Sequence, residues 1–232
     1  MNIGIILSRI RTDEKRLIAA AKTRGLGVVP IYNTSVHFDL EHPNLEIDIL
    51  LDRCADHHRA VYALKIAEDW GIPTLNTYGV AEAYGNRLLA EMALREHRVQ
   101  TPAVRVAFTP ESALEAMEEI GYPVVLKPLA LSASRGVIRA DDPAQFASAF
   151  RRIGVILEDA DIRSDATNHI LVEEYVPGNE VALEGLLDDG HLTVLALFDK
   201  PEPLEGPYFE ETIYVPPSRL PADVQAAISA TV

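Results

Sequence analysis

The sequence predicts an α/β protein whose N-terminal part is a parallel sheet covered by helices on both faces. Short apolar runs alternate with segments of helical periodicity through the first third of the chain, a pattern typical of strands joined by helical crossovers. The chain has 232 residues, of which 48% are hydrophobic and 24% charged. These values are ordinary for one or two globular domains with a buried core.

The first third contains the elements of this predicted sheet. Apolar runs predict strands at residues 2–7, 26–31, 46–51 and 72–75. Helical spacing of apolar residues predicts helices over residues 12–24, 56–70 and 79–97. The first two helices end at Gly25 and Gly71, a common position for a helix stop. The long polar segment 32–43 predicts a surface loop.

The second part of the chain begins near Ala103 and mixes strands with helices. Strands are expected at residues 104–108, 122–127, 137–139, 169–176, 181–187 and 192–198. Helices are expected to open at Thr109 and Asp142, because each is a capping residue followed by proline at the first helical position; the second should run to Phe150. Residues 188–191 (DDGH) are typical of a hairpin turn, and residues 221–230 predict a last helix.

Composition excludes several classes of function. There are 35 acidic and 21 basic residues, so the formal net charge is −14 at pH 7, which disfavours a nucleic-acid binder. No run approaches the roughly 18 apolar residues that a membrane helix needs. Cys54 is the single cysteine, so an intrachain disulfide is excluded and a reducing, cytoplasmic setting is expected. Partners are therefore expected to be small molecules, with no nucleic acid and no membrane.

The first segment with candidate chemistry is a lysine within an apolar run. Residues 122–128 (YPVVLKP) place Lys127 in a predicted strand, where burial of an ammonium is costly unless an anionic group lies beside it. A lysine that reaches solvent from a strand edge is an equally good interpretation of this segment alone.

A loop of small residues follows this strand. Residues 130–137 (ALSASRGV) would let backbone amides, the hydroxyls of Ser132 and Ser134 and the guanidinium of Arg135 approach a phosphate. It matches neither the P-loop nor the dinucleotide-binding fingerprint. A flexible turn is the default interpretation of such a loop.

Two further segments place acids and a lysine at strand ends. In residues 170–181 (ILVEEYVPGNEV), a bend at Pro177-Gly178 would expose backbone groups to a ligand, and Glu180 could accept hydrogen bonds from a diol. A plain turn with solvated acids is the alternative. Lys200 follows Asp199 at the end of an apolar run, which is also a common solvated position.

Taken in this order, the four segments resemble the ATP-grasp superfamily of carboxylate–amine ligases. The resemblance covers nearly the whole chain. It implies a pre-ATP-grasp α/β domain at residues 1–97, followed by ATP-grasp α+β subdomains: a small nucleotide-clamping subdomain at 98–175 and the incomplete start of the large subdomain at 176–232.

Particular segments resemble particular branches of the superfamily. The opening third is similar to lysine-biosynthesis ligases and their ribosomal-protein glutamate-ligase relatives at residues 8–14, 52–54 and 71–76. Residues 173–180 resemble instead the carbamoyl-phosphate-synthase-like and dipeptide-ligase branches.

The resemblance implies a role for each candidate site residue. Nucleotide phosphates would be held by Lys127, by Arg87 where the superfamily has a lysine, and by the loop residues Ser132, Ser134 and Gly136. Arg135 and Lys200 would be catalytic. The adenine edge would be read by the backbone of Glu173 and Val176, the hinge between subdomains would be Glu174 and Tyr175, and the ribose would be bound by Glu180.

The implied reaction uses ATP and Mg²⁺ to join a carboxylate substrate to an amine substrate through an acyl phosphate. The metal ligands are expected beyond Val232, so none is assigned. Glu184, Glu210 and Glu211 are interpreted as solvated or ion-paired acids. The alternative hypothesis is a non-catalytic or truncated nucleotide-binding module that needs a missing C-terminal segment or a partner. A homodimer is left open.

The remaining cysteine and histidine side chains are interpreted as structural or solvated residues. Cys54, beside a strand end, is interpreted as a small core residue. His57 and His58 are adjacent and do not share a helix face, so a metal pair is disfavoured and solvated histidines are expected. The absence of Gly-x-Gly-x-x-Gly after the first strand argues against a nicotinamide dehydrogenase.

Overall fold

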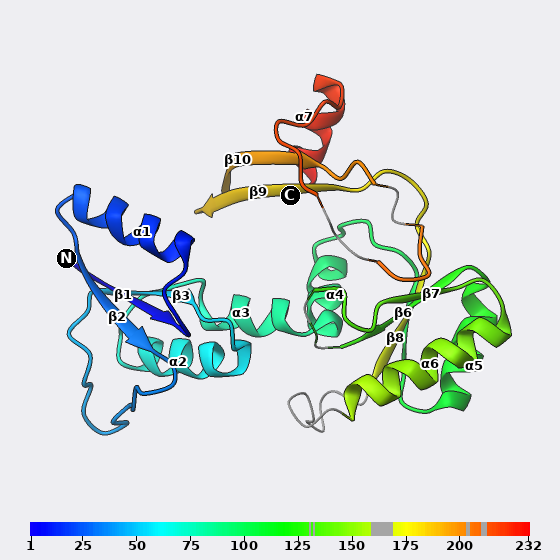
Figure 1. Cartoon of the computed structure of the whole chain (residues 1–232), viewed down its shortest axis with the longest axis horizontal. Coiled ribbons are helices and arrows are strands. Elements are labelled where there is room, and N and C mark those ends of the chain that lie inside the picture. Colours follow the sequence, from blue (N-terminus) through cyan, green and yellow to red (C-terminus); the bar gives the residue numbers. More distant parts are fainter. Residues whose placement is uncertain (130, 132, 159–168, 203–204, 210–212) are drawn as a thin grey trace. The chain divides into compact units, whose positions relative to one another are not determined.

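The computed structural model describes residues 1–129, 131, 133–158, 169–202, 205–209 and 213–232 (Figure 1). They form two compact units, Met1–Ala90 and Glu91–Val232, and each has its own hydrophobic core. Three residues discussed above, Ser132, Glu210 and Glu211, lie outside the described residues.

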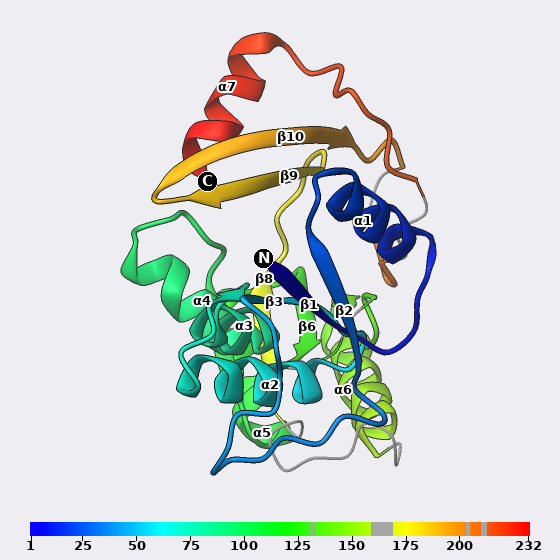
Figure 2. The ribbon, with the colours of Figure 1, turned by 90° about the vertical axis from the view of Figure 1, so that its left-hand side faces the viewer.

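The first unit is built on a four-stranded parallel sheet in the order β2-β1-β3-β4. Its elements are β1 (Asn2–Leu7), α1 (Thr12–Thr23), β2 (Gly27–Tyr32), β3 (Ile49–Arg53), α2 (His57–Asp69), β4 (Thr74–Leu75) and α3 (Tyr78–Gly85). The chain crosses from β1 to β2 in one direction and from β3 to β4 in the other. Right-handed crossovers then put α1 and α2 on opposite faces of the sheet, as Figures 1 and 2 show. The predicted parallel sheet is confirmed.

Helix α2 closes the core of this unit. Its N-cap residue is Asp56, whose carboxylate accepts a hydrogen bond from the amide of Arg59 at 3.2 Å. Alanines and a leucine at helical spacing are fully buried on one face. The buried core consists of Ile6, Ile31, Leu50, Ala63, Leu64, Ala67 and Ala81.

The single helix predicted over 79–97 is wrong, because the structure has two helices there, α3 and α4 (Arg87–Glu96). Asn86 between them is extended, with φ −126° and ψ 115°. Its side-chain oxygen accepts a hydrogen bond from the amide of Leu88 at 2.9 Å. Asparagine favours such capping over a helix interior, so Arg87 becomes the first residue of a new helix.

The second unit contains an antiparallel sheet in the order β5-β8-β6-β7. The strands and the helices that follow them are β5 (Val104–Ala107), α5 (Pro110–Ile120), β6 (Val124–Pro128), β7 (Ile138–Ala140), α6 (Pro143–Leu157) and β8 (Ile170–Glu174). Both helices start where proline after a cap predicted, at Thr109 and Asp142. Helix α6 continues seven residues past the predicted end at Phe150, to Leu157, because Ile153 and Leu157 are also buried in the core.

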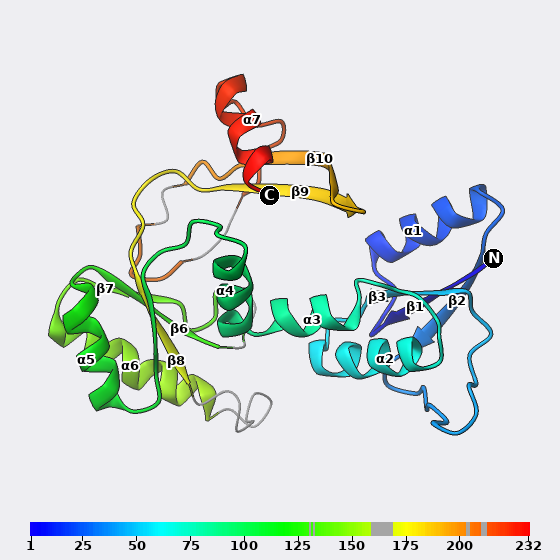
Figure 3. The same ribbon diagram turned by 180° about the vertical axis from the view of Figure 1, so that it is seen from behind.

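The rest of the second unit is a two-stranded hairpin and a helix, seen from behind in Figure 3. Strands β9 (Val181–Asp188) and β10 (His191–Asp199) are antiparallel. Asp189 and Gly190 between them both have positive φ, which matches the hairpin turn predicted from sequence. Helix α7 (Ala222–Thr231) packs on β10. Among the residues described, no helix has the length and apolar character needed to cross a membrane.

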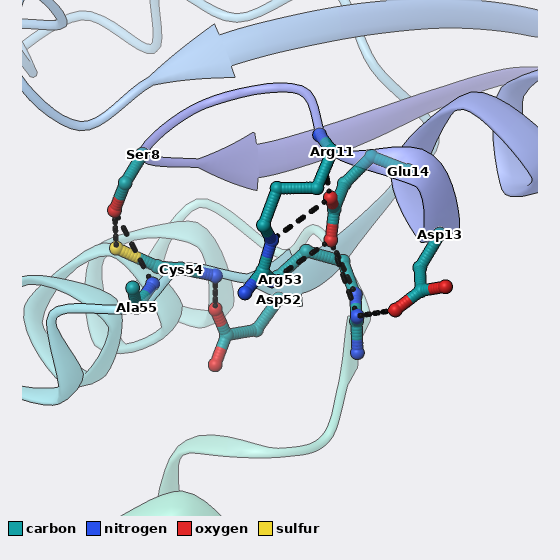
Figure 4. Close-up of polar contacts among 8 residues, drawn as sticks. All are labelled: Ser8, Arg11, Asp13, Glu14, Asp52, Arg53, Cys54 and Ala55. Carbon is teal, nitrogen blue, oxygen red and sulfur yellow. Dashed lines mark hydrogen bonds and ion pairs between the residues drawn. The ribbon is translucent and has the colours of Figure 1, made fainter.

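Glu14 is a fully buried carboxylate at the start of α1 (Figure 4). It accepts hydrogen bonds from the amide and side chain of Arg11 at 2.9–3.2 Å. Arg53, at the end of β3, donates to the same carboxylate at 3.2 Å and forms an ion pair with it at 3.1 Å. The group therefore joins the first turn of α1 to the end of β3.

These contacts favour the charged form of Glu14. Hydrogen bonds from Arg11 outweigh the opposing effect of burial and hold the pKa of Glu14 at about 2. A carboxylate whose pKa is lower in the folded state adds stability above its unfolded pKa. That contribution is lost as the pH falls from about 4.5 toward 2.

We expect Glu14→Gln to lower the free energy of unfolding of the first unit by about 2 kcal/mol at pH 7, since hydrogen bonds to a charged group are lost. The fluorescence of Trp70, the only tryptophan, reports urea unfolding of this unit. The difference from wild type should shrink as the pH falls toward 2. Glu41→Gln, at an exposed glutamate, is the control. Equal stabilities at pH 7 would contradict this role of Glu14.

Candidate functional site

The sheet of the second unit has two chemically different faces. Alternate residues of its strands pack with α5 and α6 in one core, which includes Val124, Leu126, Ile138, Ala140, Ile170, Val172, Phe146 and Ile153. Because side chains alternate along a strand, Lys127, Arg139 and Glu173 lie on the opposite face. Register places Arg139 beside Val125, and Val125 beside Glu173. The charged residues of three neighbouring strands thus share one face.

Lys127 and Glu173 form an ion pair across β6 and β8. Lys127 pairs with Leu171 and Glu173 with Val125, so the two side chains are diagonal neighbours on one face. Glu173 is buried, and 29% of the Lys127 side chain is exposed. The ammonium in this apolar strand therefore has the anionic partner that its burial requires.

The small-residue loop after β6 has a sharply bent backbone. Ala133 and Ser134 have φ of 55° and 54°, and Gly136 has φ of 74°. The positive φ favours glycine at Gly136, and a Cβ there would also make a tight contact, 3.2 Å, with the Pro128 ring. Left-handed non-glycine residues are uncommon and concentrate at functional sites. Ser134 is half-buried and Arg135 is exposed.

The predicted hinge begins where β8 leaves the sheet. The amide of Glu174 donates to the carbonyl of Ala103 at 2.9 Å, and the amide of Tyr175 donates to that of Pro123 at 3.2 Å. The residues that directly precede β5 and β6 therefore hold the end of β8. The Val176 side chain is exposed, and Gly178 has φ of 130°, so the chain turns away here toward β9.

A second lysine–glutamate pair lies at the base of the hairpin. Lys200 forms an ion pair with Glu180, and its ammonium lies 5.2 Å from the centre of the Tyr214 ring. Only 8% of the Lys200 side chain is exposed, against 50% of the Glu180 side chain. The preceding residue is anchored as well: the Ser218 hydroxyl donates to Asp199 at 2.5 Å and lowers the pKa of that carboxyl.

The structure thus brings the candidate residues together in two pairs. Each lysine predicted to face phosphates is held by a glutamate predicted to lie along the nucleoside, Lys127 by Glu173 and Lys200 by Glu180. Arg87 belongs to the first unit, as the first residue of α4. In the part of the chain that is described, no three His, Cys, Asp or Glu side chains are grouped to hold a metal ion.

A polar group at the carboxyl ends of β1 and β3 differs from the sequence interpretation. Cys54 is half-buried and its sulfur accepts a hydrogen bond from Asn33 at 2.9 Å. The Ser8 hydroxyl lies 3.5 Å from the same sulfur (Figure 4). Cys54 therefore makes polar contacts through its sulfur, in addition to being half-buried. His57 is half-buried against Tyr84, with ring centres 5.3 Å apart, and burial lowers its pKa. The expectation of a solvated side chain is confirmed for His58, which is exposed, and holds only in part for His57.

Comparisons with known proteins agree with this architecture. A family model described as the LysX preATP-grasp domain matches residues 3–83, and one described as the ATP-grasp domain matches residues 120–232. The chain is 34% identical over 146 residues to an alpha-aminoadipate–LysW ligase, LysX, of Sulfurisphaera tokodaii, covering 61% of this chain and 51% of the relative. A glutamate–LysW ligase, ArgX, of the same organism is 27% identical over 55% of this chain and 45% of its own length.

A solved structure shows the same fold over the whole length. An L-amino acid ligase from Bacillus licheniformis superposes with a TM-score of 0.75, covering 99% of this chain and 60% of the other at 23% identity. The chain spans about half the length of the curated relatives named above.

The contribution of the Lys127–Glu173 ion pair to the stability of the second unit can be tested. Glu173→Gln removes the charged partner that Lys127 has among the described residues, so we expect the free energy of unfolding of the second unit to fall by about 1–3 kcal/mol. Hydrogen exchange of the β6 amides measures this loss. The control is Glu119→Gln, which breaks an exposed ion pair with Arg105 and should cost less than about 1 kcal/mol. Equal effects of the two variants would contradict the importance of this pair.

Proposed function

The chain belongs to the ATP-grasp superfamily, and from this premise we propose that it binds ATP and serves in an ATP-dependent ligase that joins a carboxylate to an amine. The observation that carries the proposal is the pairing of Lys127 with Glu173 and of Lys200 with Glu180. Two lysines on separate sheets are thereby held in place, and phosphate oxygens are natural partners for such ammonium groups.

The residues of the clamp would each meet a different part of ATP. Lys127 and Lys200 would neutralise phosphate oxygens, with Ser134, Arg135 and Gly136 of the bent loop supplying further donors. The backbone of Glu173 and Val176 would contact the adenine edge, beside the hinge residues Glu174 and Tyr175, and Glu180 would accept from the ribose hydroxyls. The phosphate-binding roles that the resemblance implies for Arg87 and Ser132 stay predictions.

The reaction would proceed in two steps. A carboxylate oxygen attacks the γ-phosphorus, the bond to the β-phosphate oxygen breaks, and an acyl phosphate and ADP form. The amine then attacks the acyl carbon, and inorganic phosphate leaves. The protein contributes chiefly positioning and charge neutralisation in the first step, with Lys200 and Arg135 nearest the transferred group. Exclusion of water protects the acyl phosphate.

The names of relatives support a substrate class. One relative is named as joining alpha-aminoadipate to LysW and another as joining glutamate to LysW. We propose that this chain acts on substrates of the same kind, an amino acid as one reactant and an amino acid or a carrier protein as the other. A solved structure of similar fold holds MgADP, which supports Mg²⁺ as the accompanying ion; we assign it no ligand, since the described residues show no grouped set.

The second hypothesis, a non-catalytic nucleotide-binding module, is less well supported. The relatives named above are ligases. The two hypotheses share the clamp and differ in whether ATP is consumed when the substrates are present.

Nucleotide binding is the first test. In calorimetric titration with ATP, Lys127→Ala should weaken binding by about 10- to 100-fold, the loss expected for one or two charge-assisted contacts. Glu180→Ala should also weaken binding, and a fixed ATP concentration should raise the melting temperature of the wild type more than that of either clamp variant. Lys65→Ala, which removes an exposed lysine from the first unit, is the control. Unchanged affinity in both clamp variants would refute the assignment.

Ligation is the second test. With ATP, Mg²⁺ and an amino-acid carboxylate, added hydroxylamine should trap the acyl phosphate as a hydroxamate, with one phosphate released per hydroxamate formed. Lys200→Ala should reduce the rate at least tenfold through lost charge neutralisation. Bound ATP that stays intact with every carboxylate would favour the non-catalytic module.

A further inference from the structure

A short segment of the second unit, residues 205–209, runs against the edge strand β7. We call it the strap. Tyr208 forms an antiparallel bridge with Ile138, and the amide of Arg139 donates to the carbonyl of Pro207 at 2.9 Å. The strap thus continues the sheet at its β7 edge. It begins five residues after Lys200, the lysine at the end of β10.

The side chain of Arg139 adds a second layer of contact to the strap. One terminal nitrogen donates to the carbonyl of Glu205 at 2.8 Å, and Nε donates to the carboxylate of Asp141 at 2.7 Å. Gly206 has φ of 88°, and a Cβ there would lie 2.9 Å from that of Arg139. Backbone and side chain approach so closely here that only glycine fits.

The same guanidinium also packs on the hinge. Its central carbon lies 4.1 Å from the centre of the Tyr175 ring, a cation–π geometry. The Tyr175 amide donates a hydrogen bond to the carbonyl of Pro123. Both the backbone and the ring of Tyr175 are therefore held in place. Only 22% of the Arg139 side chain is exposed. A partly desolvated guanidinium with three partners restrains all of them strongly.

We propose that Arg139 is a positioning residue that ties the nucleotide hinge to the strap, and so fixes Lys200 and Glu180 relative to the adenine-reading backbone. The inference rests on the proposed ATP clamp. Tyr175 is a hinge residue of that clamp. The strap follows Lys200, the second lysine of the clamp, in the chain. A planar guanidinium serves both, because it stacks on a ring and forks its donors at once.

The substitution Arg139→Lys distinguishes a positioning role of Arg139 from a role that needs only its positive charge. Lysine keeps the positive charge but can neither stack as a plane nor donate in two directions. We therefore expect Arg139→Lys and Arg139→Met to weaken ATP binding alike, by about tenfold, comparable to one charge-assisted hydrogen bond. Amides of residues 206, 208 and 209 should exchange faster with solvent in both variants, while those of residues 124–127 in β6 keep their wild-type protection.

The experiment combines ATP titration with hydrogen exchange on the whole chain. Arg105→Lys and Arg105→Met serve as matched controls, because Arg105 lies on β5 of the same sheet in an exposed ion pair. Wild-type affinity in Arg139→Met, or full recovery in Arg139→Lys, would overturn the proposal. Faster exchange throughout β6 and β8 would also overturn it, since Arg139 would then merely support folding.

The outcome separates this inference from the proposed function. Failure of the wild-type chain to bind ATP overturns the clamp and the nucleotide role of Arg139 together. Wild-type binding that is lost in Lys127→Ala but unaffected by Arg139 substitutions upholds the clamp and overturns the positioning role alone.

Discussion

A lysine ammonium placed inside an apolar sheet needs a negatively charged neighbour, and this requirement organises the second unit. Glu173 meets it from strand β8. A shift of one residue in the pairing of β6 with β8 would turn Glu173 onto the face packed by α5 and α6, so the ion pair and the hydrophobic core select the same register. With that register fixed, β8 ends between Ala103 and Pro123, and the hinge starts at a defined point beside Val124, the register partner of Glu174.

Elements that depend on local chemistry could be predicted from the sequence. Thr109 and Asp142, each followed by proline, start helices in the structure because capping and a fixed φ act within a few residues. The turn at Asp189-Gly190 follows from the ease with which these residues adopt positive φ. Asn86 shows the limit of such reasoning: the apolar period continues across it, yet its capping side chain ends one helix and starts another.

Features that depend on distant residues could not be predicted in the same way. The sequence raised the question of a partner for Lys127, but only the strand register shows that it is Glu173. Glu14 looks like an ordinary first-turn acid, and its burial depends on Arg53, thirty-nine residues away. Arg139 received no role from its sequence context, because its partners Tyr175 and Glu205 approach it only in the folded sheet.

The left-handed bend at Ala133 and Ser134 has a consequence for the thermodynamics of ligand capture. A disordered loop must lose backbone entropy when it wraps an anion, at roughly 1–2 kcal/mol per residue ordered. Here two non-glycine residues already occupy the sparsely populated region, and Gly136 is packed against Pro128. Part of the ordering of residues 133–136 is therefore built into the fold, and these residues enter binding preorganised. Such a loop favours tight complexes through low entropic cost rather than through additional contacts.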